Sequence, residues 1–109
     1  MAYKLVNADE VEAQRGIFKA LTRLLGVEAF GINMVELAPG AAGLEHDHAG
    51  DRQEEVYVPL RGRGSLRVDG EVLDLEPGVI AFVSPESTRQ LVASSEQGFT
   101  FVAVGGARP

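Results

Sequence analysis

Apolar residues near the start of the chain recur at helical spacing. The residues that share one stripe of such a helix are Ile17, Leu21, Leu24 and Leu25. Gly26 follows directly, and glycine commonly ends a helix because it tolerates the left-handed conformation. The pattern therefore predicts one short helix from about Ile17 to Leu25.

Beyond Gly26 the pattern changes to short apolar runs separated by turn residues. The segment 30–37 carries a single charged residue, Glu36, which is typical of a half-buried strand. Further runs of this kind occupy residues 56–60, 66–68, 72–75, 79–83, 91–92 and 99–104. About seven or eight short strands at regular spacing predict an all-β sandwich or barrel, with its core over about residues 30–104.

One pair of strands has a particularly clear signal. The runs 66–68 and 72–75 flank Asp69-Gly70-Glu71, and Asp-Gly between two alternating segments is a strong indication of a tight β-hairpin. We therefore predict that these two strands pair directly.

Composition narrows the class of protein. The chain has 109 residues with 45% hydrophobic content, so we expect a single domain over residues 1–109. Sixteen acidic against ten basic residues give a net charge of −6, which disfavours nucleic acid and anionic membranes as partners. The absence of cysteine excludes disulfides and thiolate metal sites. No apolar stretch approaches the roughly 20 residues of a membrane span, and we expect a soluble, cytoplasmic protein.

The two histidines of the chain, His46 and His48, are candidate metal ligands. If residues 44–48 are extended, both imidazoles project from one face while Asp47 points to the other. Glu54 or Glu55, at the start of the next apolar run, can supply a third ligand, and strand register decides which. Two neutral imidazoles and a carboxylate suit a divalent ion of iron, manganese, zinc, nickel or cobalt. The alternative is a chance pair of surface histidines that binds nothing.

From Pro39 to Gln90 the chain resembles the two motifs of the cupin superfamily. In the first motif, five residues separate Gly40 from His46-Asp47-His48, and six residues separate Glu55 from Gly62. The resemblance selects Glu55 over Glu54 as the metal-binding carboxylate. The gap from His48 to Glu55 is longer than the family usually has, and we expect it to lengthen a loop.

The second motif matches only in part. Gly78 is in place, but Ser84-Pro85-Glu86 stands where the family has Pro-x-Gly, and Arg89 stands where the third metal histidine belongs. A guanidinium offers only donors and cannot be a ligand. In one outcome a metal binds His46, His48 and Glu55, with Gln53 as a further oxygen ligand, while Arg89 binds an anionic substrate group. In the other outcome Arg89 pairs with Glu55 and no metal binds.

Strand parity assigns roles to other residues of the same region. Tyr57 has the parity of Glu55, so it faces the interior, either as a hydrogen-bond donor to substrate or as core. The opposite face carries Val56, Val58 and Leu60, which suit packing against another sheet or a second subunit. We expect the phenylalanines Phe82, Phe99 and Phe101 in the core.

The resemblance implies a fold and a range of functions. The expected fold is the cupin double-stranded β-helix, a jelly-roll barrel preceded by the short helix, and single-domain cupins usually form homodimers. The first hypothesis is a metal-dependent enzyme acting on a small anionic organic molecule, with oxygen activation or carbonyl polarisation as the available chemistry. The alternatives are a non-catalytic small-molecule binding or sensor domain and a structural barrel without metal.

Overall fold

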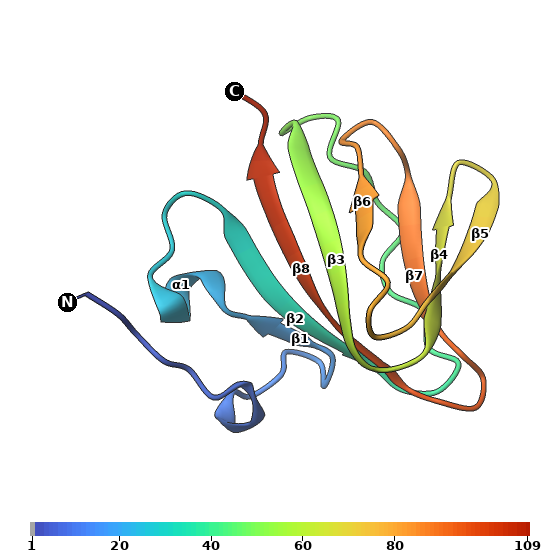
Figure 1. Cartoon of the computed structure of the whole chain (residues 1–109), viewed down its shortest axis with the longest axis horizontal. Helices are drawn as coiled ribbons and strands as arrows, with labels where there is room; N and C mark the ends of the chain where they lie inside the picture. Colours follow the sequence, from blue (N-terminus) through green and yellow to red (C-terminus); the bar gives the residue numbers. More distant parts are fainter. Residues whose placement is uncertain (1) are drawn as a thin grey trace.

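The computed structural model describes residues 2–109 as two facing β-sheets (Figure 1). Its strands are β1 Phe18–Ala20, β2 Gly31–Leu37, β3 Gln53–Gly62, β4 Gly64–Val68, β5 Glu71–Leu75, β6 Ala81–Val83, β7 Arg89–Ala93 and β8 Phe99–Ala107. One sheet has the order β1-β2-β8-β3-β6 and the other β5-β4-β7, with every pairing antiparallel. The sheets do not close into a complete barrel, but the arrangement is that of a jelly roll. The predicted all-β class is confirmed.

The N-terminal helix is shorter than its apolar pattern predicts. Helix α1 covers Thr22–Leu25, and a 3-10 turn lies at Ala8–Glu10. The first part of the predicted helix is instead strand β1, in which Phe18 pairs with Val35 of β2. The prediction was wrong there because pairing with a sheet edge outweighed a helical spacing of few residues. Gly26 does end the helix, with a φ of 77°.

The predicted hairpin is confirmed. Val68 of β4 pairs with Glu71 of β5, which leaves Asp69 and Gly70 as a two-residue loop. Both loop residues have positive φ, 51° and 79°, as a tight turn that follows the twist of its strands requires.

The core lies between the two sheets and follows strand parity. Tyr57 of β3 is 2% exposed, whereas its neighbours Val56 and Val58 are half-buried on the outer face. Phe99 and Phe101 are buried, as predicted. The prediction was wrong for Phe82, which is 53% exposed. Because Ala81 and Val83 of this short strand pair with Tyr57 and Glu55, Phe82 between them points away from the core.

One end of the sandwich gathers the residues of interest. In Figure 1 the beginnings of β3 and β7 and the end of β6 lie at the top of the molecule. Glu55 pairs with Val83 at the end of β6 and with Gly105 of β8. Within residues 2–109, no helix has the length and apolar character needed to cross a membrane.

Candidate metal centre

The histidines lie on a segment that extends the smaller sheet. Residues 41–48 run antiparallel to β7, with bridges that join Ala42 to Val92 and His46 to Arg89. The backbone of His46 and that of Arg89 exchange two hydrogen bonds of 3.0 and 2.9 Å. The two side chains therefore stand side by side on the inner face. The segment is irregular, yet it has the extended course that the His-x-His spacing requires.

Three candidate ligand atoms converge on one point. Nε2 of His46 lies 3.4 Å from Oε1 of Glu55, and Nε2 of His48 lies 3.2 Å from the same oxygen. One ligand atom from each residue lies within 4.8 Å of the others. The two imidazole rings are 5.0 Å apart and nearly perpendicular. Glu54 faces the other way and pairs with Arg108 at 3.1 Å, so the structure supports the choice of Glu55.

The opposite nitrogen of each imidazole has its own acceptor. Nδ1 of His46 lies 3.0 Å from the carbonyl oxygen of Leu44, and Nδ1 of His48 lies 3.1 Å from a carboxylate oxygen of Asp51. Carbonyl and carboxylate oxygens only accept, so both Nδ1 atoms must be the donors. In neutral imidazoles the Nε2 lone pairs then face the Glu55 carboxylate. A cation bound between these three atoms would stabilise this arrangement.

Arg89 stands beside this cluster and is enclosed by the protein. It is 0% exposed, although it is the longest side chain of the interior. Its Nε donates to the Tyr57 hydroxyl at 3.1 Å and its Nη2 to Glu55 Oε1 at 3.1 Å. Its Nη1 donates to the carbonyl oxygens of Ser84 and Ser87 at 3.3 and 2.6 Å. Four of the five N–H groups of the guanidinium thus have partners within the chain.

The surroundings keep Glu55 ionised. Burial acts to raise the pKa of its carboxyl, but the 2.6 Å hydrogen bond from the Tyr57 hydroxyl and the electrostatic interactions with His48, Arg89 and His46 outweigh it and hold the pKa below its usual value. The pKa of Tyr57 is raised far above its usual value by burial and by the adjacent Glu55 carboxylate. Tyr57 therefore stays protonated and keeps donating to Glu55.

The remaining predicted residues have these positions. Tyr57 faces the interior as predicted, with its hydroxyl between Glu55 and Arg89. The Nε2 of Gln53 donates to Asp51 at 3.2 Å, so its part in metal binding stays a prediction. Asp47 is exposed and accepts from the backbone of Ala49.

The sequence motifs did not predict two sets of contacts in the site, those of Asp51 and those of the Ser84 and Ser87 carbonyl oxygens. Asp51 lies in the loop before β3, and the sequence shows only that the loop is long. The carbonyl oxygens of Ser84 and Ser87 are backbone groups that any residue could supply. Both contacts depend on loop conformation, which a spacing pattern does not describe.

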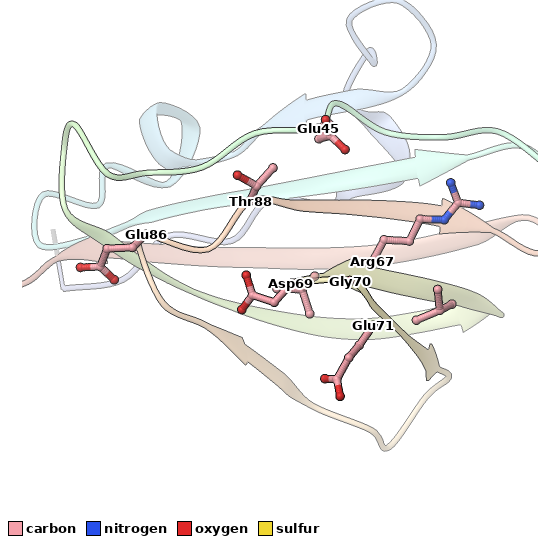
Figure 2. Close-up of a pocket in the computed structure, with 9 residues that line it drawn as sticks. Glu45, Arg67, Asp69, Gly70, Glu71, Glu86 and Thr88 are labelled. Atoms are coloured by element: carbon pink, nitrogen blue, oxygen red, sulfur yellow. The ribbon is translucent and has the colours of Figure 1, made fainter.

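A cavity of about 520 Å³ lies elsewhere, around the β4–β5 hairpin (Figure 2). It shares no residue with the His46, His48 and Glu55 cluster. Its polar lining residues, labelled in Figure 2, are Glu45, Arg67, Asp69, Glu71, Glu86 and Thr88. The cluster therefore lies outside this cavity.

Comparisons with known proteins agree with this architecture. Residues 33–105 match the sequence model of the cupin domain. A glucose-6-phosphate isomerase from Pyrococcus horikoshii is 32% identical over 79 residues, which cover 62% of this chain and 42% of that protein. The matched region thus spans less than half the length of this curated relative.

Solved structures show the same fold. A cupin protein from Bacteroides fragilis has a TM-score of 0.85 at 23% identity, over 98% of this chain and 86% of the other. A sugar phosphate isomerase of the cupin superfamily from Silicibacter pomeroyi has a TM-score of 0.78 at 24% identity, over 97% of this chain and 77% of the other.

Proposed function

Because the chain belongs to the cupin family, we propose that it binds a divalent metal ion and acts through that ion on a small anionic organic molecule. The ligands in this proposal are His46, His48 and Glu55. The observation that supports it most directly is the convergence of both Nε2 atoms on Glu55 Oε1, while both Nδ1 atoms donate to acceptors behind the rings. Imidazoles oriented in this way present their lone pairs to an ion.

The donor set fits the proposed group. Two imidazole nitrogens and one carboxylate oxygen suit iron, manganese, zinc, nickel or cobalt, and three protein ligands leave positions for water or substrate. When bound, such an ion supplies Lewis acidity or a centre for oxygen activation. The residues around it hold the carboxylate in place, because Tyr57 and Arg89 both donate to Glu55 Oε1.

The substrate class is proposed from a relative. The Pyrococcus horikoshii relative is a glucose-6-phosphate isomerase, and we propose a small anionic compound of the sugar phosphate kind as the first class to test. Substrate contacts by Arg89 and Tyr57 stay predictions. Arg89 is 0% exposed and already makes four hydrogen bonds within the chain. One N–H group is left to bind a substrate.

We also propose a homodimer. The outer face of the five-stranded sheet carries half-buried apolar residues that a second copy would cover: Ile32, Val56, Val58, Val102 and Val104. A cytoplasmic location stays a prediction.

Metal content tests the proposal directly. We expect near-stoichiometric metal by elemental mass spectrometry in protein purified without a polyhistidine tag, and none in the His46→Ala/His48→Ala double variant. Glu55→Gln should lose most of the metal, and Glu54→Gln, the matched control on the outer face, should retain it. Absence of metal from the wild type after incubation with all five ions contradicts the proposal.

A second function is favoured by one specific contact. Nη2 of Arg89 lies 3.1 Å from Glu55 Oε1 and supplies positive charge to the site without an ion. A metal-free protein of this kind would be a non-catalytic binding or sensor domain. Arg89→His should then create metal binding that the wild type lacks, and it should bind the ion more tightly than Arg89→Leu, which removes the charge without adding a ligand.

A further inference from the structure

The loop between the histidines and β3 holds a carboxylate behind one imidazole. Asp51 lies in this loop, which the long gap between His48 and Glu55 provides. The loop turns sharply: Arg52 has a left-handed φ of 59°, and its backbone N–H donates to the carbonyl of His48 at 2.8 Å. This turn brings the Asp51 side chain back to the ring that precedes it by three residues.

The Asp51 carboxylate makes contacts on two sides. Its two oxygens lie 3.1 and 3.2 Å from Nδ1 of His48. They also accept from the backbone N–H of Gln53 at 3.3 Å and from its side-chain amide at 3.2 Å. Gln53 therefore holds the carboxylate against the imidazole. The side chain of Asp51 is itself 52% exposed, so its removal leaves the core intact.

The other imidazole is held differently. Nδ1 of His46 contacts the carbonyl oxygen of Leu44, a backbone group, at 3.0 Å. No side-chain substitution removes that acceptor. The two rings therefore allow a comparison within one molecule, since only His48 depends on a side chain for its orientation.

We infer that Asp51 is a positioning residue of the metal centre, which fixes His48 with its proton on Nδ1 and its Nε2 lone pair directed at Glu55. This inference deepens the proposed metal-binding function and rests on it for its consequence, the affinity for the ion. The loop between His48 and Glu55 thus provides the carboxylate that lies behind the ring. Carboxylates in this position commonly change metal affinity by about 10–100-fold when they are removed.

The first arm of the test uses metal-free protein labelled with ¹⁵N. Two-bond ¹H–¹⁵N correlation spectra, recorded at alkaline pH, report which nitrogen of each ring carries the proton. We expect both wild-type rings to have the proton on Nδ1. In Asp51→Ala the population of this tautomer should fall for His48 and stay the same for His46.

The second arm measures zinc affinity by competition with a chromogenic chelator. We expect Asp51→Ala to bind zinc about 10-fold more weakly than the wild type. Asp51→Asn keeps an acceptor oxygen and should retain more of the affinity. Asp47→Ala is the matched control, because it removes the same charge from a neighbouring exposed position without touching a histidine.

The two arms separate two kinds of failure. An unchanged His48 tautomer in Asp51→Ala, or an equal change at His46, overturns the positioning role. Equal zinc affinities of Asp51→Ala and Asp47→Ala also overturn it. If the wild type binds no metal at all, the proposed function fails, while the tautomer spectra still decide whether Asp51 orients His48.

Discussion

Replacing Arg89 by leucine tests how the interior of the site is held together. Arg89 has no exposed surface, and its guanidinium donates to Glu55, to the Tyr57 hydroxyl and to two backbone carbonyls. Leucine fills part of the same volume but makes none of these bonds. Glu55 is left as a carboxylate that is only 13% exposed and has lost its permanent counter-charge.

The expected loss of stability follows from this geometry. Removal of one partner of a buried ion pair costs about 3–5 kcal/mol, because the other charge stays buried. The two carbonyls and the tyrosine lose their donors as well, and the apolar contacts of leucine offset part of the loss. We expect a decrease of about 3 kcal/mol in the free energy of unfolding, or about 10–15 °C in the melting temperature of a domain of this size.

Urea denaturation of metal-free protein, followed by circular dichroism, measures this quantity. The control is Arg67→Leu, an exposed arginine on the neighbouring strand β4, for which we expect a change within about 0.5 kcal/mol. In the double variant Arg89→Leu/Glu55→Gln, the orphaned charge is gone, so its loss should be smaller than the sum of the two single losses by at least about 1 kcal/mol. An Arg89→Leu variant within 1 kcal/mol of the wild type, or strictly additive losses, would refute the ion-pair reasoning.

Two further predictions concern Glu55 and the glycine beside it. Folding lowers the pKa of Glu55, so its carboxylate contributes stability at pH values above 4.5, and this stability is lost as the pH falls through the lower pKa of the folded state. The difference in unfolding free energy between wild type and Glu55→Gln should therefore shrink in acid. A constant difference between pH 7 and pH 3 contradicts this. Gly105→Ala should weaken metal binding, since the added carbon would lie 3.0 Å from Gln53 Oε1 and 3.3 Å from Glu55 Cγ, whereas Gly106→Ala, whose nearest contact would be 3.7 Å, should bind metal like the wild type in the same chelator assay.

The sequence predicted the β architecture because its signals are local. The Asp69-Gly70 turn and the alternation along β3 depend only on neighbouring residues, and both were confirmed. The position of the histidines also followed from local parity, since residues two apart on an extended segment share a face. The choice of Glu55 required the motif resemblance, because parity alone left Glu54 open.

The errors arose where tertiary pairing decides the structure. Residues 18–20 have a spacing that also fits a helix, and only the presence of the β2 edge selects a strand. The expectation that Phe82 lies in the core was wrong for the same reason. The register of β6 against Tyr57 and Glu55 turns Ala81 and Val83 inward and Phe82 outward.

The sequence predicted which residues form the site more completely than it predicted their contacts. One of the two outcomes considered for Arg89 paired it with Glu55, and both outcomes left its other donors undefined. Their partners are carbonyls of the turn 84–87, which no side-chain pattern specifies. The role of Asp51 likewise depends on the left-handed conformation of Arg52, which is uncommon for a residue other than glycine.

The presence of an arginine where the family has an imidazole changes the charge of the site as well as its ligands. A neutral imidazole at position 89 would add a nitrogen that can bind the metal and would add no charge. Arg89 instead offsets the carboxylate of Glu55 at 3.1 Å, so the pocket around a bound ion is one unit more positive. The added charge opposes the binding of the cation and favours an anionic ligand upon it. These two effects have opposite signs. Loss of the charge in Arg89→Leu should therefore strengthen metal binding and weaken the affinity of the metal-loaded protein for phosphate. Two changes in the same direction would show that position 89 acts through geometry and not through charge.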